Sequence, residues 1–312
     1  MKRLFFCLAV LGVILTGCSK NDDGESDNPN NSGNEQPENP NEPKLPELPA
    51  LPDPDDVCSA MDDLNFMAFC YEKFDVNKDG KVSVTEANAA KEIYTTSSKW
   101  VSVKGIERFP NIEILSLNGS SITELDLRYN LKLKSISGYS SLLTTVLLPN
   151  TLTSIEKSAF KECASLIEIH FPASLTSIGE YAFSGCSSLT EIHLPANLTS
   201  IGRSTFSGCS SLTEINLPNN LTSIGVSAFY GCSSLTEIIF SDNLTSIGEF
   251  AFEHCSNLTK VTCYALVPPK SNGYIFGYHR IIDSLYVPTE SIQAYRDSSL
   301  WANNFKNILP IE

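Results

Sequence analysis

Apolar residues in the second half of the chain return at a fixed spacing of 23 residues. Five consecutive segments between Thr151 and Ala265 share the same apolar columns. The columns are Ile155, Ile178, Ile201, Ile224 and Ile247; Phe160, Phe183, Phe206, Phe229 and Phe252; Cys163, Cys186, Cys209, Cys232 and Cys255; Leu166, Leu189, Leu212, Leu235 and Leu258; and Ile169, Ile192, Ile215, Ile238 and Val261. A fixed period of this length predicts a solenoid, whose coils cannot bury their own apolar edges and therefore stack and require a cap at each end.

Alternation within each repeat indicates where its strand lies. In Leu189–Leu194, Ile192 and Leu194 are predicted to point inward, so Glu191 and His193 point outward. Stacked coils place such strands side by side in a parallel sheet, with neighbours ~4.8 Å apart. The sequence therefore predicts a β-rich solenoid with a parallel sheet on one face and short helical or irregular turns on the other.

The cysteines belong to the core pattern and do not resemble a disulfide framework. Those of the repeats stand at a core position between phenylalanine and leucine, and the chain contains no C-x-x-C pair. We predict that these five are buried free thiols. Cys58 and Cys70 flank a predicted helix in an oxidising compartment, so their pairing stays open at this point.

A twelve-residue segment ahead of the repeats matches the calcium-loop pattern D-x-[DN]-x-[DN]-G-x5-E in full. The predicted oxygen ligands are Asp75, Asn77, Asp79, the backbone carbonyl of Lys81, Ser83 and Glu86. Gly80 permits the sharp turn, and Val82 is expected to pack inward. We predict one structural calcium ion, held at the ~10⁻⁴–10⁻³ M affinity of extracellular modules because the loop has no partner loop. The alternative is a polar turn without metal.

The segments beside this loop are predicted to be helical. Met61–Phe74 carries Leu64, Met67 and Tyr71 at spacings of three and four, and Thr85–Tyr94 is predicted to be the exit helix. Residues 57–98 are therefore predicted to form a small EF-hand-like helical cap.

The N-terminus has the pattern of an exported protein. The apolar run Leu4–Leu15 is shorter than the ~20 residues needed to span a bilayer and predicts a signal peptide over residues 1–17. Leu15–Cys18 resembles the bacterial lipobox, which implies that Cys18 is acylated and anchors the protein to a membrane. Ser19–Asp23 resembles a surface-export signal of Bacteroidetes lipoproteins. We therefore expect an outer-membrane lipoprotein exposed on the cell surface.

Residues 18–56 are predicted to form a disordered tether. The segment is rich in Asn, Pro, Glu and Asp, and large apolar side chains are few, so it cannot bury enough surface to fold. It also carries most of the formal net charge of −14. An acidic chain without clustered Lys and Arg argues against nucleic-acid binding.

The repeated text LTSIGxxAFxGCSSLTEIxLP resembles the BspA-like, or Treponema-type, leucine-rich-repeat family of bacterial surface proteins. The resemblance implies looser, degenerate repeats over residues 99–146, five 23-residue repeats over residues 147–265 and a C-terminal cap over residues 266–312. It also implies surface binding, since some members are linked to adhesion to host proteins. The fourth repeat departs from the pattern, with Ser241-Asp242 where other repeats have proline.

The predicted ligand surface is the outward face of the repeat strands. Its residues are Glu168, His170, Glu191, His193, Glu214, Asn216, Glu237 and Ile239. Catalytic residues are not predicted, because no nucleophile set and no glycine-rich phosphate loop occurs. Adjacent histidines and glutamates could hold a metal ion, although exposed histidines on a repeat face are usually solvated. We predict an adhesin-like protein that binds a protein ligand of host or neighbouring cells; a glycan-binding accessory protein and a structural spacer are the alternatives.

Overall fold

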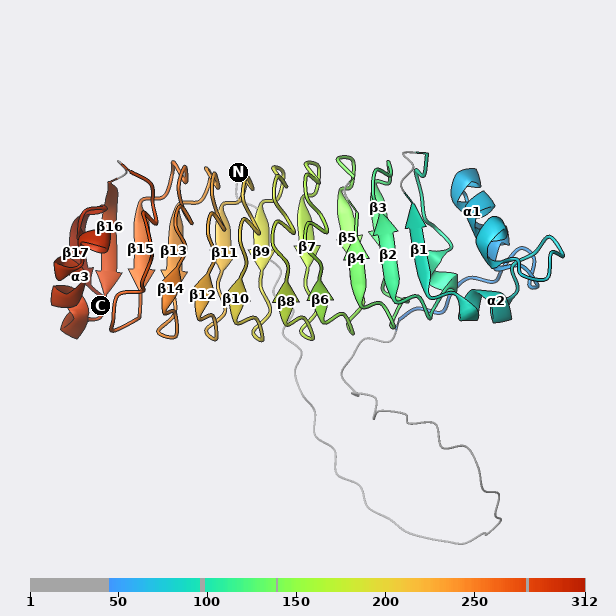
Figure 1. Ribbon diagram of the computed structural model, residues 1–312, viewed down its shortest axis with the longest axis horizontal. Helices are drawn as coiled ribbons and strands as arrows, with labels where there is room; N and C mark the ends of the chain where they lie inside the picture. Colours follow the sequence, from blue (N-terminus) through green and yellow to red (C-terminus); the bar gives the residue numbers. More distant parts are fainter. Residues whose placement is uncertain (1–44, 96–98, 139, 279–280, 312) are drawn as a thin grey trace, which may run out of the picture. The chain divides into compact units, whose positions relative to one another are not determined.

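The computed structural model describes residues 45–95, 99–138, 140–278 and 281–311, and these form one solenoid (Figure 1). The predicted signal peptide, Cys18 and the tether as far as Lys44 lie outside the described residues. The predicted solenoid and its parallel pairing are confirmed.

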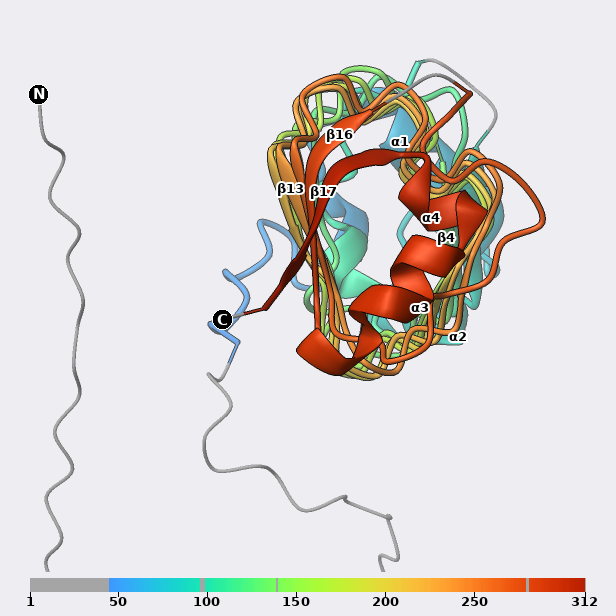
Figure 2. The ribbon, with the colours of Figure 1, turned by 90° about the vertical axis from the view of Figure 1, so that its left-hand side faces the viewer.

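Two walls of parallel strands run along the solenoid, and Figure 2 shows β13, β16 and β17 on one side and β4 on the other. The first wall consists of β3 (Glu124–Asp126), β5 (Thr145–Leu147), β7 (Glu168–His170), β9 (Glu191–His193) and β11 (Glu214–Asn216), followed by β13 (Glu237–Phe240), β15 (Lys260–Cys263), β16 (Ile282–Val287) and β17 (Phe305–Pro310). The second consists of β1 (Glu92–Thr95), β2 (Ile114–Leu117), β4 (Ser135–Ser137), β6 (Ser154–Ile155), β8 (Ser177–Ile178), β10 (Ser200–Ile201), β12 (Ser223–Ile224) and β14 (Ser246–Ile247). Short helical or irregular turns were expected opposite the sheet, and the structure shows a ladder of two- to four-residue strands there as well.

The core between the walls is a set of ladders of identical side chains. Ile192 pairs with Ile215, and both are buried. The phenylalanine rings from Phe160 to Phe252 stack at centroid distances of 5.2 to 5.5 Å, with interplanar angles of 12 to 18°. Each ring is therefore covered by the same ring of the next coil, which is why one coil alone cannot bury its edge.

The repeat cysteines form a ladder of their own. All five are buried free thiols, as predicted. The Sγ of Cys186 donates to the carbonyl of Phe160 at 3.1 Å, and the next three cysteines repeat this bond one coil further on. Burial raises the pKa of Cys163 to about 11 and that of Cys209 to about 12. The thiols are therefore protonated at neutral pH, as hydrogen-bond donors must be.

The glycine of the LTSIG text is explained by close backbone approach. A Cβ on Gly248 would lie 2.3 Å from the amide nitrogen of Val226, and one on Gly225 would lie 2.6 Å from the carbonyl carbon of Gly202. Only glycine fits where successive coils touch main chain to main chain.

The N-terminal cap contains η1 (Val57–Ala60), α1 (Leu64–Phe74) and α2 (Val84–Ala89). The first helix begins three residues later than predicted because Asp63 caps it, accepting from the N–H groups of Asn65 and Phe66. Its buried residues are Phe66 and Cys70, while Leu64 is 75% exposed, so the predicted apolar face was wrong at its first position. The second helix is shorter than predicted because Glu92–Thr95 pairs with β2 as the first strand of its wall.

Part of the predicted tether lies against the solenoid. The hydroxyl of Tyr129 donates to the carbonyl of Pro46 at 2.8 Å, the guanidinium of Arg108 donates to the carbonyl of Pro49, and Leu51 packs on the core. The predicted tether was therefore extended too far, to Asp56. Composition alone does not show that the prolines and leucines of its last residues contact the solenoid.

The C-terminal cap contains η3 (Thr289–Ser291), α3 (Ile292–Asp297) and α4 (Ser299–Ala302), with β16 and β17 completing the first wall. In the end-on view of Figure 2 the two helices lie across the end of the solenoid. Another short helix, η2 (Ile106–Arg108), lies in the turn before β2. Cys58 and Cys70, whose pairing the sequence left open, are both buried free thiols in the structure.

Candidate functional site

The predicted ligand residues form two straight columns on the outer face of the first wall. Glu191 pairs in register with Glu214, and His193 pairs with both His170 and Asn216. The outward side chains are exposed, whereas the isoleucine between them is buried in every strand from β7 to β13. The structure therefore brings the predicted face together, although Glu237 and Ile239 belong to the next hydrogen-bonded sheet.

Histidines and glutamates of the same strand are neighbours on this face. His193 Nε2 lies 2.7 Å from Glu191 Oε1, and His170 Nε2 lies 3.8 Å from Glu168 Oε1. All four side chains are more than half exposed, so these contacts contribute little to stability. Their side chains can instead reorganise around a ligand.

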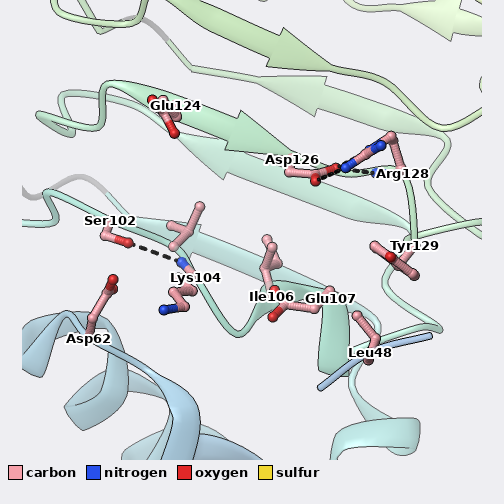
Figure 3. Close-up of a pocket in the computed structure, with 11 residues that line it drawn as sticks. Leu48, Asp62, Ser102, Lys104, Ile106, Glu107, Glu124, Asp126, Arg128 and Tyr129 are labelled. Atoms are coloured by element: carbon pink, nitrogen blue, oxygen red, sulfur yellow. Dashed lines mark hydrogen bonds and ion pairs between the residues drawn. The ribbon is translucent and has the colours of Figure 1, made fainter. Parts of the chain in front are cut away.

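Strand register carries the two columns beyond the predicted residues, through Thr145 and Leu147, to Glu124 and Asp126 beside a hollow. Thr145 pairs with Glu168 on one side and with Glu124 on the other, and Leu147 pairs in the same way with His170 and Asp126. Glu124 and Asp126 line a hollow of about 380 Å³ between β3 and the turn that holds Ser102 and Glu107 (Figure 3). Sequence reasoning missed both residues because they precede the regular repeats, and only strand register assigns them to the same columns.

Charges inside the hollow are arranged around one fixed ion pair. Arg128 holds Asp126 with two hydrogen bonds, of 3.0 Å from Nε and 2.7 Å from Nη2. Burial would raise the pKa of Asp126, but the guanidinium of Arg128 outweighs burial and lowers it. Figure 3 shows Asp62, Lys104, Glu107 and Glu124 around the same space. The hollow therefore carries more negative than positive charge, which favours a cationic group of a ligand.

The opposite end of the same face loses its acidic character. Lys260 stands in register with Glu237, binds its carboxylate at 3.1 Å and lies 5.7 Å from the ring centroid of Tyr286. Ile239 is 49% exposed. The face thus changes along its length from acidic to a region where Lys260 balances the charge of Glu237 and Ile239 adds an apolar surface.

The calcium-loop residues lie together in the N-terminal cap. Both carboxylate oxygens of Asp75 accept from loop amides, Oδ1 from Asp79 at 3.2 Å and Oδ2 from Gly80 at 3.1 Å. Glu86 reaches back to the N–H of Val76 at 2.8 Å. Ser83 caps α2 and donates to Glu86, and these bonds lower the pKa of Glu86 to about 2.

These bonds close the loop from its first position to its last and leave an oxygen-only donor set, which suits a hard cation. Across the described ranges, no group of three His, Cys, Asp or Glu side chains is gathered closely enough to hold a metal ion. The oxygen donors of the loop suit calcium in chemistry, but their side chains are not gathered around one point, and calcium binding stays a prediction. The metal alternative for His170 and His193 gains no support from the same observation.

Within the part of the chain that the structure describes, no helix has the length and apolar character to cross a membrane.

Stacked 23-residue coils, parallel strands and buried ladders define a leucine-rich-repeat solenoid. The chain belongs to the family described as BspA type leucine rich repeat region, whose model matches six copies over residues 90–188 and 132–259. No curated protein matches the chain.

Several solved structures resemble the chain. A T. pallidum leucine-rich-repeat protein, TpLRR, is 26% identical, with 52% of this chain and 72% of that chain covered and a TM-score of 0.37. A leucine-rich-repeat protein from Bacteroides ovatus is 18% identical, with 72% and 76% covered and a TM-score of 0.34. A leucine rich cell surface protein from Faecalibacterium prausnitzii is 20% identical, with 71% and 61% covered and a TM-score of 0.38. At these TM-scores the family assignment rests on the repeat match.

Proposed function

We propose that the protein is an adhesin-like surface protein that binds a protein ligand of host or neighbouring cells through the outer face of its first wall. The observation that supports this most is the column of exposed carboxylates from Glu168 to Glu214, which neighbouring strands hold in register. Like charges placed opposite one another on a sheet are destabilising. Repulsion within this column reduces stability, while the buried isoleucines beneath it are the same in each strand. A column kept at such a cost is suited to binding a partner of opposite charge.

The charge of this face selects a basic partner. Glu124 and Asp126 add two carboxylates at one end of this face, and the hollow beside them offers a place for a Lys or Arg side chain. Exposed charges are screened beyond ~8–10 Å at physiological ionic strength, so binding should weaken as salt is added.

The test is binding of the full chain to a panel of immobilised host matrix proteins. We expect at least one basic protein to bind, and the double variant Glu191→Lys and Glu214→Lys to abolish that binding. The matched control is Glu162→Lys with Glu180→Lys, which makes the same charge change at exposed turn positions. If the sheet variant and the control bind equally, the ligand does not use this face.

Cys18 is proposed to carry the lipid anchor that displays the protein at the outer surface of the cell. The lipobox resemblance supports this assignment. Cys18→Ala should move the protein from the membrane fraction to the soluble fraction, and an unchanged distribution would place the anchor elsewhere.

A further inference from the structure

A second hollow lies at the C-terminal end of the solenoid, between residues 271–278 and α4, and its lining differs in chemistry from the acidic face. It has a volume of about 350 Å³ and is lined chiefly by Asn272, Tyr274, Tyr278, Ser299, Asn303 and Asn304. Every lining side chain described there is uncharged. We call it the tyrosine pocket.

Two exposed rings form one side of the tyrosine pocket. Tyr274 is 45% exposed and Tyr278 is 58% exposed. Their centroids lie 4.4 Å apart with an angle of 44° between the planes, and Tyr278 also packs on Phe250 at 5.7 Å. A tyrosine ring offers an apolar face and a polar hydroxyl, so the pair can meet a ligand that has both characters.

The backbone that carries these rings is fixed by the last coil. Phe250 donates to the carbonyl of Tyr274 at 2.6 Å, and Phe252 donates to that of Ile275 at 2.9 Å. Ile275 and Phe276 are fully buried beneath them. The backbone at Tyr274 is therefore fixed before any ligand arrives, and Tyr278 packs on the rings of Tyr274 and Phe250, which lowers the entropy cost of binding.

Side-chain amides also line the pocket, Asn303 and Asn304 just after α4 and Asn272 on the same segment as the rings. Asn303 and Asn272 are exposed at its edge. Asn304 is 6% exposed, and its Nδ2 donates to the carbonyl of Leu300 at 2.8 Å, which fixes its side chain and leaves its oxygen as an acceptor. Side-chain amides both donate and accept, so they match hydroxyl groups, which do the same.

The absence of charge in this lining separates the tyrosine pocket from other hollows of the described chain. The hollow beside β3 contains Asp126 and Arg128, and one beside β17 contains Arg296 and Lys306. A carboxylate or phosphate ligand requires cationic donors, which those hollows offer and the tyrosine pocket does not.

We propose that the tyrosine pocket binds an uncharged sugar unit of a glycan. The apolar C–H face of the sugar ring stacks on Tyr278 and Tyr274, and its hydroxyl groups hydrogen-bond to Asn272, Asn303 and Asn304. The pocket volume lies at the small end of the ~300–1,000 Å³ range of ligand sites, which suits one ring of a longer chain. The tyrosine pocket shares no residue with the acidic face, so the two proposals fail independently.

The experiment is an array of neutral oligosaccharides, built from hexose, pentose and N-acetylhexosamine units, beside sialylated and sulfated ones, probed with the full chain. Binding to neutral glycans is expected. Tyr278→Ala and Asn303→Ala should each weaken it by roughly tenfold, as truncation of a central contact does. Tyr278→Phe keeps the ring and should retain binding.

The matched control is Tyr264→Ala, which removes an equally exposed tyrosine, 46% exposed, that lies outside the pocket. Asn303 is exposed, so its variant tests the pocket without threatening the fold. Binding confined to anionic glycans, no binding to any neutral glycan, or full binding by both Tyr278→Ala and Asn303→Ala would overturn the proposal.

Discussion

Both ends of the solenoid contain packed aromatic rings, and the N-terminal end adds carboxylates that accept backbone N–H groups. At the N-terminal end, carboxylates accept backbone N–H groups: Asp56 accepts from Cys58 and Val82, and Asp63 accepts from Val101 and from the first turn of α1. At the C-terminal end, rings close the core, among them Trp301, Tyr295, Phe276 and Phe305. The stability of the first end should therefore depend on these carboxylates as well as on packed rings, and that of the second chiefly on packed volume.

The chain has two tryptophans, and one lies in each cap. Trp100 packs on Phe66 at 4.9 Å and on Phe69 at 5.1 Å, whereas Trp301 packs on Tyr295 at 5.2 Å. Trp301→Phe therefore leaves a fluorescence reporter of the N-terminal end, and Trp100→Phe leaves one of the C-terminal end. The two reporters distinguish unfolding of the N-terminal end from unfolding of the C-terminal end.

Trp301→Ala is expected to have the largest effect. The ring is fully buried, and its Nε1 donates to the carbonyl of Pro269 at 3.1 Å. Its loss should reduce the free energy of unfolding by ~3–5 kcal/mol, as for other large core truncations. Denaturant unfolding followed by far-UV circular dichroism measures it, because Trp100 reports the N-terminal end and Trp301 is missing from this variant. Val267→Ala, at a 72% exposed position, should change stability by less than ~0.5 kcal/mol. A similar loss in both variants would contradict aromatic closure of this end.

Asp63→Ala should have the next effect, at the opposite end. Burial would raise the pKa of Asp63, but four backbone N–H groups outweigh it and lower that pKa. Alanine leaves these groups without their acceptor, which should cost ~2–3 kcal/mol. The loss should appear at Trp100 in denaturant unfolding, while Trp301 reports a smaller change. Asp62→Ala, an exposed neighbour, is the control; equal losses would mean that capping is not what stabilises this end.

Calcium should stabilise only the N-terminal end. A ligand at tenfold excess over its Kd adds ~1.4 kcal/mol to the native state. Melting curves in millimolar calcium and in chelator should differ at Trp100 and coincide at Trp301. Glu86→Gln should remove the difference. Identical curves at both tryptophans would show that the loop is a polar turn without metal.

The smallest predicted effect is that of acid, which should weaken the N-terminal end before the C-terminal end as the pH falls below about 4.5. Hydrogen bonds from Ser83 lower the pKa of Glu86 from its usual 4.5 to about 2. A carboxylate with a lowered pKa stabilises the fold fully above its unfolded pKa, and this contribution is lost as pH falls from about 4.5 to about 2. An acid titration in chelator should change the Trp100 signal before the Trp301 signal, and Glu86→Gln should reduce this separation. Simultaneous changes would contradict it.

The repeated part of the fold could be predicted from the sequence because each coil meets a copy of itself. Period, strand position and buried cysteines follow once identical residues are known to stack, as the ladder of Cys186 onto Phe160 illustrates. The second ladder of strands escaped prediction, because two residues such as Ser200–Ile201 are too few to show an alternation.

Both caps were predicted, but the contacts within them and the hollows were not, because these contacts occur once and join distant segments. Tyr129 meets Pro46 across 83 residues, and no local pattern indicates that pair. The same holds for Tyr278 and Asn303, which approach only because the last coil ends beside α4. The exposed columns were found where the repeat is regular and missed at Glu124 and Asp126, where it is not.

The small angles between stacked phenylalanine rings have a consequence for the spacing of charge. Coils that add with so little rotation keep the carboxylates of Glu168, Glu191 and Glu214 at intervals of one strand separation, ~4.8 Å. In an extended peptide that lies along the column, alternate side chains are ~6.8 Å apart. Within two coils they no longer lie opposite the carboxylates. A helix presents one side chain per ~5.4 Å turn and stays close to step over the same length. The spacing of these carboxylates therefore matches the side chains of a basic helix better than those of a basic strand.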